Sequence, residues 1–184
     1  GQVVSVTAVV SDDGVTPSAP ATDSVVIVNT APLVTAATVS PDEPRTNDAL
    51  SCQLTSEDGD LDVVSHHVTW TVNGLVVPAA SSTTLAASFT RKGDQVTCEG
   101  VPDDGETLGA PVSATAWVGN TPPVITSMSL AASSYLPDDD VVVDATSFDA
   151  DDDHVSLTFT WWVNGLEVQS GTSSWLDSAW TAAG

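Results

Sequence analysis

Basic residues are almost absent from this chain. Its 184 residues include 3 Lys and Arg side chains against 25 Asp and Glu, which gives a formal charge of −22. A protein that binds nucleic acid needs clustered Lys and Arg to neutralise phosphates, and docking on an anionic membrane surface needs the same charge. The composition therefore argues against a nucleic-acid-binding protein and against a protein that docks on anionic membranes.

Long apolar runs are missing as well. No run of about 18 or more apolar residues occurs, so no membrane-spanning segment is expected. Hydrophobic residues still make up 41% of the chain, too many for a disordered acidic protein. No basic and apolar leader precedes Gly1, so we expect either a removed signal peptide or a piece of a longer protein. The acidic composition is typical of an exported surface protein, and equally of a protein from a salty environment.

Signatures of common enzymes are also lacking. The sequence has no Cys-x-x-Cys pair, no Gly-rich phosphate loop and no Gly-x-Ser-x-Gly motif. His66 and His67 are consecutive, so a strand turns them to opposite faces, and His154 is expected on the surface. The acidic residues cluster in turn-like segments with no matched acid and base environment. We therefore do not expect an enzyme.

What the sequence does contain is an internal repeat. Asn29-Thr30-Ala31-Pro32 matches Asn120-Thr121-Pro122-Pro123 at an offset of 120 − 29 = 91. The same offset aligns further segments: 69–75 with 160–166, 12–14 with 103–105, and 58–62 with 149–153. Roughly a third of the aligned positions are identical, which predicts a tandem array of domains of about 91 residues.

Each repeat has the pattern of an all-β domain. Short runs alternate apolar and polar residues, and Asn73-Gly74 and Asn164-Gly165 have the composition of tight hairpin turns. No window carries a helical apolar stripe. About seven short strands in about 90 residues predict an antiparallel β-sandwich. We expect strands near 33–39, 48–55, 67–73, 75–79, 84–90, 95–101 and 110–118.

The order of Cys52, Trp70 and Cys98 sharpens this prediction. They fall in the second, third and sixth expected strands. This order resembles the immunoglobulin fold, in which a disulfide joins the two sheets and packs on a buried Trp. The resemblance implies a Cys52–Cys98 bridge, with two buried free thiols as the alternative. At the constant offset, the equivalent positions in the flanking repeats are Val143 and Thr7.

Together these motifs resemble the tandem immunoglobulin-like (PKD-like) repeats of large bacterial surface and secreted proteins. The motifs are Asn-Thr-Pro-Pro at the repeat boundary, an Asp-rich loop, Trp-x-Val-Asn-Gly, and Gly-Asp-Gln-Val-Thr-Cys followed by Asp-Asp-Gly. The resemblance implies a spacer, stalk or adhesive role outside the cell, and no catalysis. The flanking repeats depart from the pattern because they lack the cysteines.

The repeat also predicts three segments. Residues 1–28 correspond to the last two strands of a repeat, 29–119 to a complete domain, and 120–184 to a domain without its last two strands. Two explanations are open: a window cut from a longer array, or donor-strand exchange, in which residues 1–28 complete residues 120–184 of a neighbouring chain. Both predict an elongated assembly whose partners are adjacent repeats or copies of the chain.

The acidic loops are the candidate metal sites. In an immunoglobulin-like topology, the loops after the second and sixth strands share the end where the linker arrives, at Asn29 or Asn120. Alternating carboxylates supply the oxygen ligands that Ca²⁺ requires, and solvated turn residues are the alternative. The expected ligands are Asp58, Asp60, Asp62, Asp103 and Asp104 at one loop cluster, and Asp149, Asp151 and Asp153 at the other, with Asp152 as a further candidate.

The tryptophans have two expected roles. Trp70 and Trp161 share one repeat position and are expected in a core, and Trp117 is expected at a joint between repeats. Three further tryptophans are expected either at a domain interface or stacked on a surface glycan: Trp162, Trp175 and Trp180. We expect a stiff, acidic, extracellular spacer, stalk or filament segment, with an adhesin or glycan-binding module as the alternative.

Overall fold

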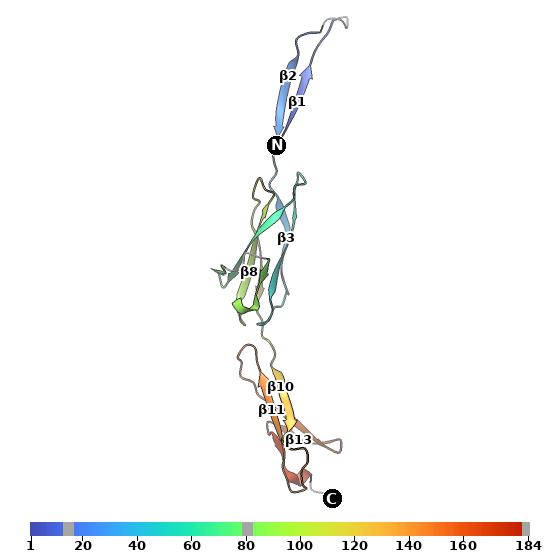
Figure 1. Cartoon of the computed structure of the whole chain (residues 1–184), viewed down its shortest axis with the longest axis vertical. Helices are drawn as coiled ribbons and strands as arrows, with labels where there is room; N and C mark the ends of the chain where they lie inside the picture. Colours follow the sequence, from blue (N-terminus) through green and yellow to red (C-terminus); the bar gives the residue numbers. More distant parts are fainter. Residues whose placement is uncertain (13–16, 79–82, 182–184) are drawn as a thin grey trace. The chain divides into compact units, whose positions relative to one another are not determined.

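The computed structural model describes residues 1–12, 17–78 and 83–181, and it is built from antiparallel strands and two single 3₁₀ turns. The chain divides into two compact units, whose strands can be followed in Figure 1. The first unit comprises Gly1–Asp42, Leu50–Leu85 and Gln95–Ala116, and the second comprises Glu43–Ala49, Ala86–Asp94 and Trp117–Gly184.

A separate hairpin begins the first unit. Strand β1 (Gln2–Ala8) pairs with β2 (Ala21–Ile27) along its whole length, from Gln2 opposite Ile27 to Ala8 opposite Ala21. Every residue of both strands is exposed, although Val and Ile are frequent among them. The hairpin thus has apolar side chains that no described residue covers.

The rest of the first unit holds two sheets, arranged as in a β-sandwich. One sheet has the order β3 (Leu33–Ser40), β4 (Leu50–Glu57), β7 (Thr84–Leu85). The other has the order β6 (Leu75–Val76), β5 (Ser65–Val72), β8 (Gln95–Asp103), β9 (Val112–Trp117). A disulfide between Cys52 of β4 and Cys98 of β8 joins the two sheets, with their Cα atoms 6.0 Å apart. The all-β class and the bridge are confirmed.

The core of this sandwich forms around Trp70. Its side chain is fully buried, as are those of Leu85, Val96 and Cys98. Burial alternates along β8, because successive side chains of a strand point to opposite faces. The prediction that Trp70 lies in a core is confirmed.

Two expected strands differ from the observed ones. The strand expected at 84–90 is wrong beyond Leu85, because Ala87–Phe89 forms a 3₁₀ turn, η1. There the amides of Phe89 and Thr90 donate to the carbonyls of Ala86 and Ala87, which turns the chain instead of extending it. The strand expected at 75–79 is observed only at β6, and its end lies outside the described residues.

The second unit also holds two sheets. The first has the order β10 (Val124–Leu130), β11 (Val141–Phe148), β14 (Trp175–Leu176). The second contains β12 (Phe159–Val163) and β13 (Leu166–Gly171). The 3₁₀ turn η2 (Ser178–Trp180) follows, and the Asp177 side chain accepts a hydrogen bond from the Ala179 amide at its start.

The paired strands of the two units follow the same register. Leu33 lies opposite Glu57, and Val124 lies opposite Phe148, so each residue of the second pair is 91 positions after its equivalent in the first. Each sheet pair also has a tight hairpin at the positions predicted for it. Asn73 and Gly74 have φ values of 50° and 79°, and Asn164 and Gly165 have 51° and 82°. Positive φ at both turn residues is what such a hairpin turn requires.

Candidate metal centre

The first acidic loop directly follows β4. The Asp58 Oδ1 atom accepts hydrogen bonds from the amides of Asp60, at 2.8 Å, and Asp62, at 3.2 Å. Leu61 between them has a positive φ of 67°, which turns the loop back on itself. One carboxylate oxygen from each of Asp58, Asp60 and Asp62 therefore lies within 4.8 Å of the others.

This loop also holds the linker that leads into β3. The Thr30 amide donates to Asp60 Oδ2 at 2.6 Å. The other oxygen of Asp58, Oδ2, is buried and has no hydrogen-bond partner among the described residues. A buried carboxylate oxygen without a partner is costly, so this atom calls for a cation or a donor that the chain itself does not supply.

The second acidic loop follows β11 and has the same hydrogen bonds. The Asp149 Oδ1 atom accepts from the amides of Asp151, at 2.8 Å, and Asp153, at 3.2 Å. The Thr121 amide donates to Asp151 Oδ2 at 2.5 Å, as Thr30 does to Asp60. The three carboxylates again lie within 4.8 Å of one another, and Asp149 is almost fully buried.

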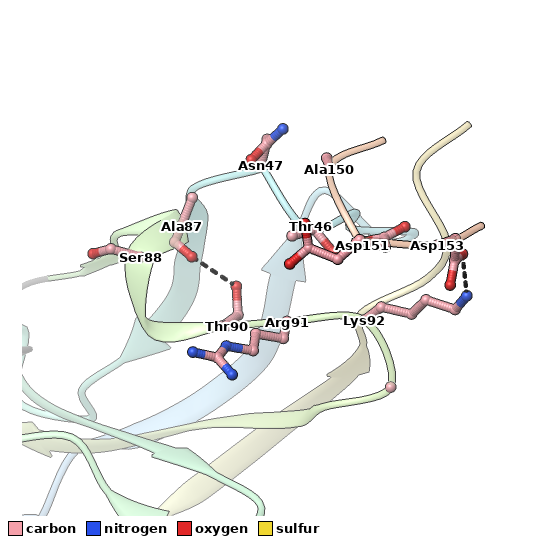
Figure 2. Close-up of a pocket in the computed structure, with 12 residues that line it drawn as sticks. Thr46, Asn47, Ala87, Ser88, Thr90, Arg91, Lys92, Ala150, Asp151 and Asp153 are labelled. Atoms are coloured by element: carbon pink, nitrogen blue, oxygen red, sulfur yellow. Dashed lines mark hydrogen bonds and ion pairs between the residues drawn. The ribbon is translucent and has the colours of Figure 1, made fainter. Parts of the chain in front are cut away.

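The second loop contacts a basic side chain, and the first loop has no such contact among the described residues. Lys92 Nζ lies 2.6 Å from Asp153 Oδ2, and Figure 2 shows the two side chains pointing toward each other. This contact is the main reason that the pKa of Lys92 is raised above its ordinary value. The Thr46 hydroxyl donates to Asp151, and together with the Thr121 amide it lowers the pKa of that carboxyl.

A cavity of about 860 Å³ lies beside these contacts within the second unit. Its lining includes Thr46, Arg91, Lys92 and 150–153 (Figure 2). The sequence contains only 3 Lys and Arg side chains, and two of them line this cavity. The second acidic loop is therefore partly neutralised by the chain itself, whereas no ion pair between a basic side chain and the first loop is found among the described residues.

Asp103 and Asp104 lie at the end of β8 and in the loop after it, and they make their own set of contacts. Asp104 Oδ2 accepts from the Asn29 side-chain amide at 2.8 Å, and its Oδ1 atom accepts from the amides of Glu106 and Thr107. The bond from Asn29 is the largest cause that lowers the pKa of Asp104. The consecutive residues Asn29 and Thr30 are thus held by two different loops.

Asp103 has a further partner that the sequence analysis missed. The Gly105 amide donates to Asp103 Oδ1, and His67 Nε2 lies 2.9 Å from Asp103 Oδ2. Both contacts lower the pKa of Asp103, with the amide as the larger cause. Neither Asp103 nor Asp104 belongs to the three-carboxylate groups that the described residues form. His66 contacts Ser56, so the two histidines do point to different partners.

The other predicted site residues have simpler surroundings. The Asn120 side-chain amide donates to the Thr121 carbonyl at 3.2 Å, whereas the equivalent Asn29 donates to an acidic side chain. Trp161 is half-buried, and its indole N–H donates to the Ser173 carbonyl. Four tryptophans have large exposed areas: Trp117, Trp162, Trp175 and Trp180.

The donor chemistry of the first loop fits a hard divalent cation. Ca²⁺ takes about six to eight oxygen ligands at about 2.3–2.6 Å. Asp58, Asp60 and Asp62 bring carboxylate oxygens together, and the orphaned Asp58 Oδ2 faces no other donor in the described structure. In the second loop Lys92 already occupies one carboxylate, so the fit of a cation is weaker there.

No protein-family model matches this chain, and no curated protein matches it either. Among the described residues, no helix has the length and apolar content to cross a membrane.

Proposed function

We propose that this chain is a structural, extracellular spacer or stalk built from tandem immunoglobulin-like β-sandwich repeats, without catalytic activity. Its acidic loops are the elements that hold the linker of each repeat in place. The observation that carries this proposal is the recurrence of one contact at two linkers. The amides of Thr30 and Thr121, 91 residues apart, are each held by the middle carboxylate of an acidic loop.

The disulfide supports an extracellular location, because such bridges form and persist in oxidising compartments. The formal charge of −22 supports a spacer role, since mutual repulsion keeps neighbouring chains soluble and apart. The matching register of β3–β4 and β10–β11 supports the tandem arrangement.

Calcium would act at the first acidic loop. Asp58, Asp60 and Asp62 would hold the ion, and the ion would neutralise three carboxylates that otherwise repel one another. Asp60 also accepts the Thr30 amide, so ordering of this loop orders the linker as well. The expected result of calcium binding is a stiffer connection between the linker and the sandwich that follows it.

Small-angle X-ray scattering with calcium and with a chelator tests this proposal. We expect calcium to narrow the range of maximum dimensions of the wild-type chain. The Asp58→Asn variant should show the same range with calcium and with the chelator. Asp23→Asn, which removes one carboxylate outside the loops, serves as the matched control and should respond like the wild type. The role of the metal would be contradicted if calcium changed neither the scattering nor the melting temperature of the wild-type chain.

A second candidate function is glycan binding. It is favoured by the exposure of Trp162, Trp175 and Trp180, which are 60%, 47% and 51% exposed. Aromatic rings with one open face are suited to stacking on sugars. Binding on a glycan array that is lost in Trp162→Ala, Trp175→Ala or Trp180→Ala would support an adhesin, and no binding by the wild type would leave the structural role as the sole proposal.

A further inference from the structure

The second acidic loop (149–153) carries more negative charge than the first (58–62). The first contains three aspartates and the second contains four, because Asp152 stands at the position of Leu61. Both residues have a positive φ, 67° at Leu61 and 59° at Asp152, so the two loops turn in the same way despite this difference. The additional carboxylate increases the repulsion within the second loop, which therefore has a strong need of a positive charge.

A positive charge is already present at the second loop. Lys92 Nζ donates a hydrogen bond to Asp153 Oδ2 at 2.6 Å. The charge of Lys92 also attracts the carboxylates of Asp149 and Asp151. A lysine ammonium is a compact point charge with three N–H donors, so it is suited to a group of several carboxylate oxygens. The cation bound at this loop is thus a side chain of the protein itself.

The buried oxygens of the second loop all have partners. Asp149 is 7% exposed, and its Oδ1 atom accepts the amides of Asp151 and Asp153. Among the described residues, the only buried side-chain oxygen without a hydrogen-bond partner is Asp58 Oδ2, in the first loop. The buried oxygens of the second loop are therefore satisfied by groups of the chain itself, as a loop that needs no metal ion requires.

The backbone beside Lys92 is paired with the second linker (residues 118–121). The Gly93 amide donates to the Val118 carbonyl at 2.8 Å, and the Val118 amide donates to the Asp94 carbonyl at 2.9 Å. The two residues that follow Lys92 are thus joined to the linker by main-chain hydrogen bonds. The Lys92 side chain therefore extends to the acidic loop from a backbone that is anchored on the linker.

A second segment also contacts this linker. The Gly119 amide donates to the Pro44 carbonyl at 2.7 Å, and the Thr46 amide donates to the Thr121 hydroxyl at 3.2 Å. The Thr46 hydroxyl donates to Asp151, whose other oxygen accepts the Thr121 amide. The linker, both flanking segments and the acidic loop thus form one connected network within the second unit.

We propose that the Lys92 ammonium takes the place of a metal ion at the second acidic loop, so that this loop holds its linker without calcium. Lys92 is thereby a specificity-determining residue, because it decides that the loop contains an ammonium and not a divalent ion. Its removal should leave four carboxylates without their cation and convert the loop into a calcium site. The proposal deepens the proposed function and rests on one part of it, the role of the acidic loops in holding the linkers.

An ammonium and a calcium ion compete for the same place at this loop. Ca²⁺ binds carboxylate oxygens at about 2.3–2.6 Å. Lys92 Nζ is 2.6 Å from Asp153 Oδ2, so both cations would occupy the same position at this oxygen. The ammonium is tethered to the loop by the chain, and its effective concentration there does not fall when calcium is scarce. The linker is therefore held at any calcium concentration.

Arg91 provides a matched comparison for Lys92. It lines the same cavity and carries the same charge, but no ion pair among the described residues includes it. Figure 2 shows its guanidinium pointing away from Asp151 and Asp153. Arg91→Met and Lys92→Met therefore change the net charge of the chain equally, and only Lys92→Met removes the ammonium from the loop.

Calcium titration by isothermal calorimetry tests the proposal in an Asp58→Asn background, in which the first loop lacks one of its ligands. Asp58→Asn/Lys92→Met should bind calcium with a dissociation constant at least about tenfold lower than that of Asp58→Asn/Arg91→Met. Adding Asp149→Asn to the Lys92→Met variant should weaken the binding again, which would assign the new site to the second loop. Equal binding by the Lys92→Met and Arg91→Met variants would overturn the proposal.

Amide exchange at the second linker is the second test. In the wild-type chain the Thr121 amide, which donates to Asp151, should exchange at the same rate with calcium and with a chelator. Lys92→Met should raise this rate at least about tenfold in the chelator, and calcium should restore the slow exchange. A wild-type Thr121 amide that is protected only when calcium is present would overturn the proposal.

The two loops are tested independently by these measurements. A wild-type chain that binds no calcium would contradict the role proposed for the metal at the first loop. The comparison of Lys92→Met with Arg91→Met would still decide the role of Lys92, because it concerns the second loop alone. Failure of the tethered ammonium is therefore distinguishable from failure of the metal-stiffened spacer.

Discussion

The sheet pair of the first unit and the sheet pair of the second follow one strand register but differ in burial. Leu85 and Leu176 occupy matching positions and are both buried, at 0% and 3% exposure. Val34 is buried and its counterpart Ile125 is exposed. Val143, the counterpart of Cys52, is buried in the second unit as well, whereas Leu130, the counterpart of the buried Val39, is exposed. Among the described residues, the second sheet pair is thus buried over only part of the surface that is buried in the first.

The largest expected difference between the two units is the loss of stability when the equivalent residues Trp70 and Trp161 are replaced. Trp70→Ala should lower the free energy of unfolding by about 3–5 kcal/mol, because it leaves a large cavity in a closed core. Trp161→Ala should cost less than about 2 kcal/mol, since Trp161 is only half-buried. Urea unfolding followed by circular dichroism at low protein concentration measures both. Equal losses would mean that the second core is as closed as the first.

Removal of the Cys52–Cys98 disulfide should lower the free energy of unfolding by nearly as much as Trp70→Ala does. The bridge closes a loop of 46 residues, and the chain-entropy model assigns about 4 kcal/mol to a loop of that length. The double variant Cys52→Ala/Cys98→Ala should therefore unfold at a much lower urea concentration. The difference in stability between the two units should also be absent in this variant. An unchanged urea midpoint would show that the bridge does not hold the sheets together.

Calcium should stabilise the protein more through the first acidic loop than through the second. With free calcium at about 100 times its dissociation constant, binding to the first loop should add about 2.7 kcal/mol of stability. Asp58→Asn should abolish most of this gain, whereas Asp149→Asn should abolish little, because Lys92 already contacts Asp153 in the second loop. Thermal unfolding with calcium and with chelator measures the gain. Equal losses in the two variants would contradict the distinction between the loops.

The smallest expected effect is the pH dependence of the Asn29 contact. The pKa of Asp104 is lowered in the folded chain, chiefly by the Asn29 amide, so its contribution is present above about pH 4 and is lost as the pH falls through the folded value. Asp104→Asn should lower the melting temperature at pH 7 and should converge on the wild type in acid. Glu99→Gln, an exposed carboxylate on β8, is the control and should run parallel to the wild type at every pH.

Much of the fold could be predicted from sequence alone. Alternating apolar residues and the Asn-Gly pairs predicted the strands and both hairpin turns, because these signals are local. The Cys52–Cys98 bridge could be predicted because its spacing with Trp70 resembles a known order. The 3₁₀ turn at Ala87–Phe89 could not, since its apolar residues have the same local pattern as a strand end.

The candidate site was less predictable. The two groups of three Asp residues were expected together, and each is brought within 4.8 Å. The contacts of Lys92 with Asp153 and of Thr46 with Asp151 join segments far apart in sequence, and no local pattern indicates them.

The central claim is that the first acidic loop binds calcium and holds the linker at Thr30. Hydrogen–deuterium exchange with calcium and with a chelator tests it most directly. We predict that the amides of Thr30, Asp60 and Asp62 exchange more slowly with calcium than with the chelator, while the amides of β5 exchange equally in both. Exchange at these three amides that does not change with calcium would contradict the claim.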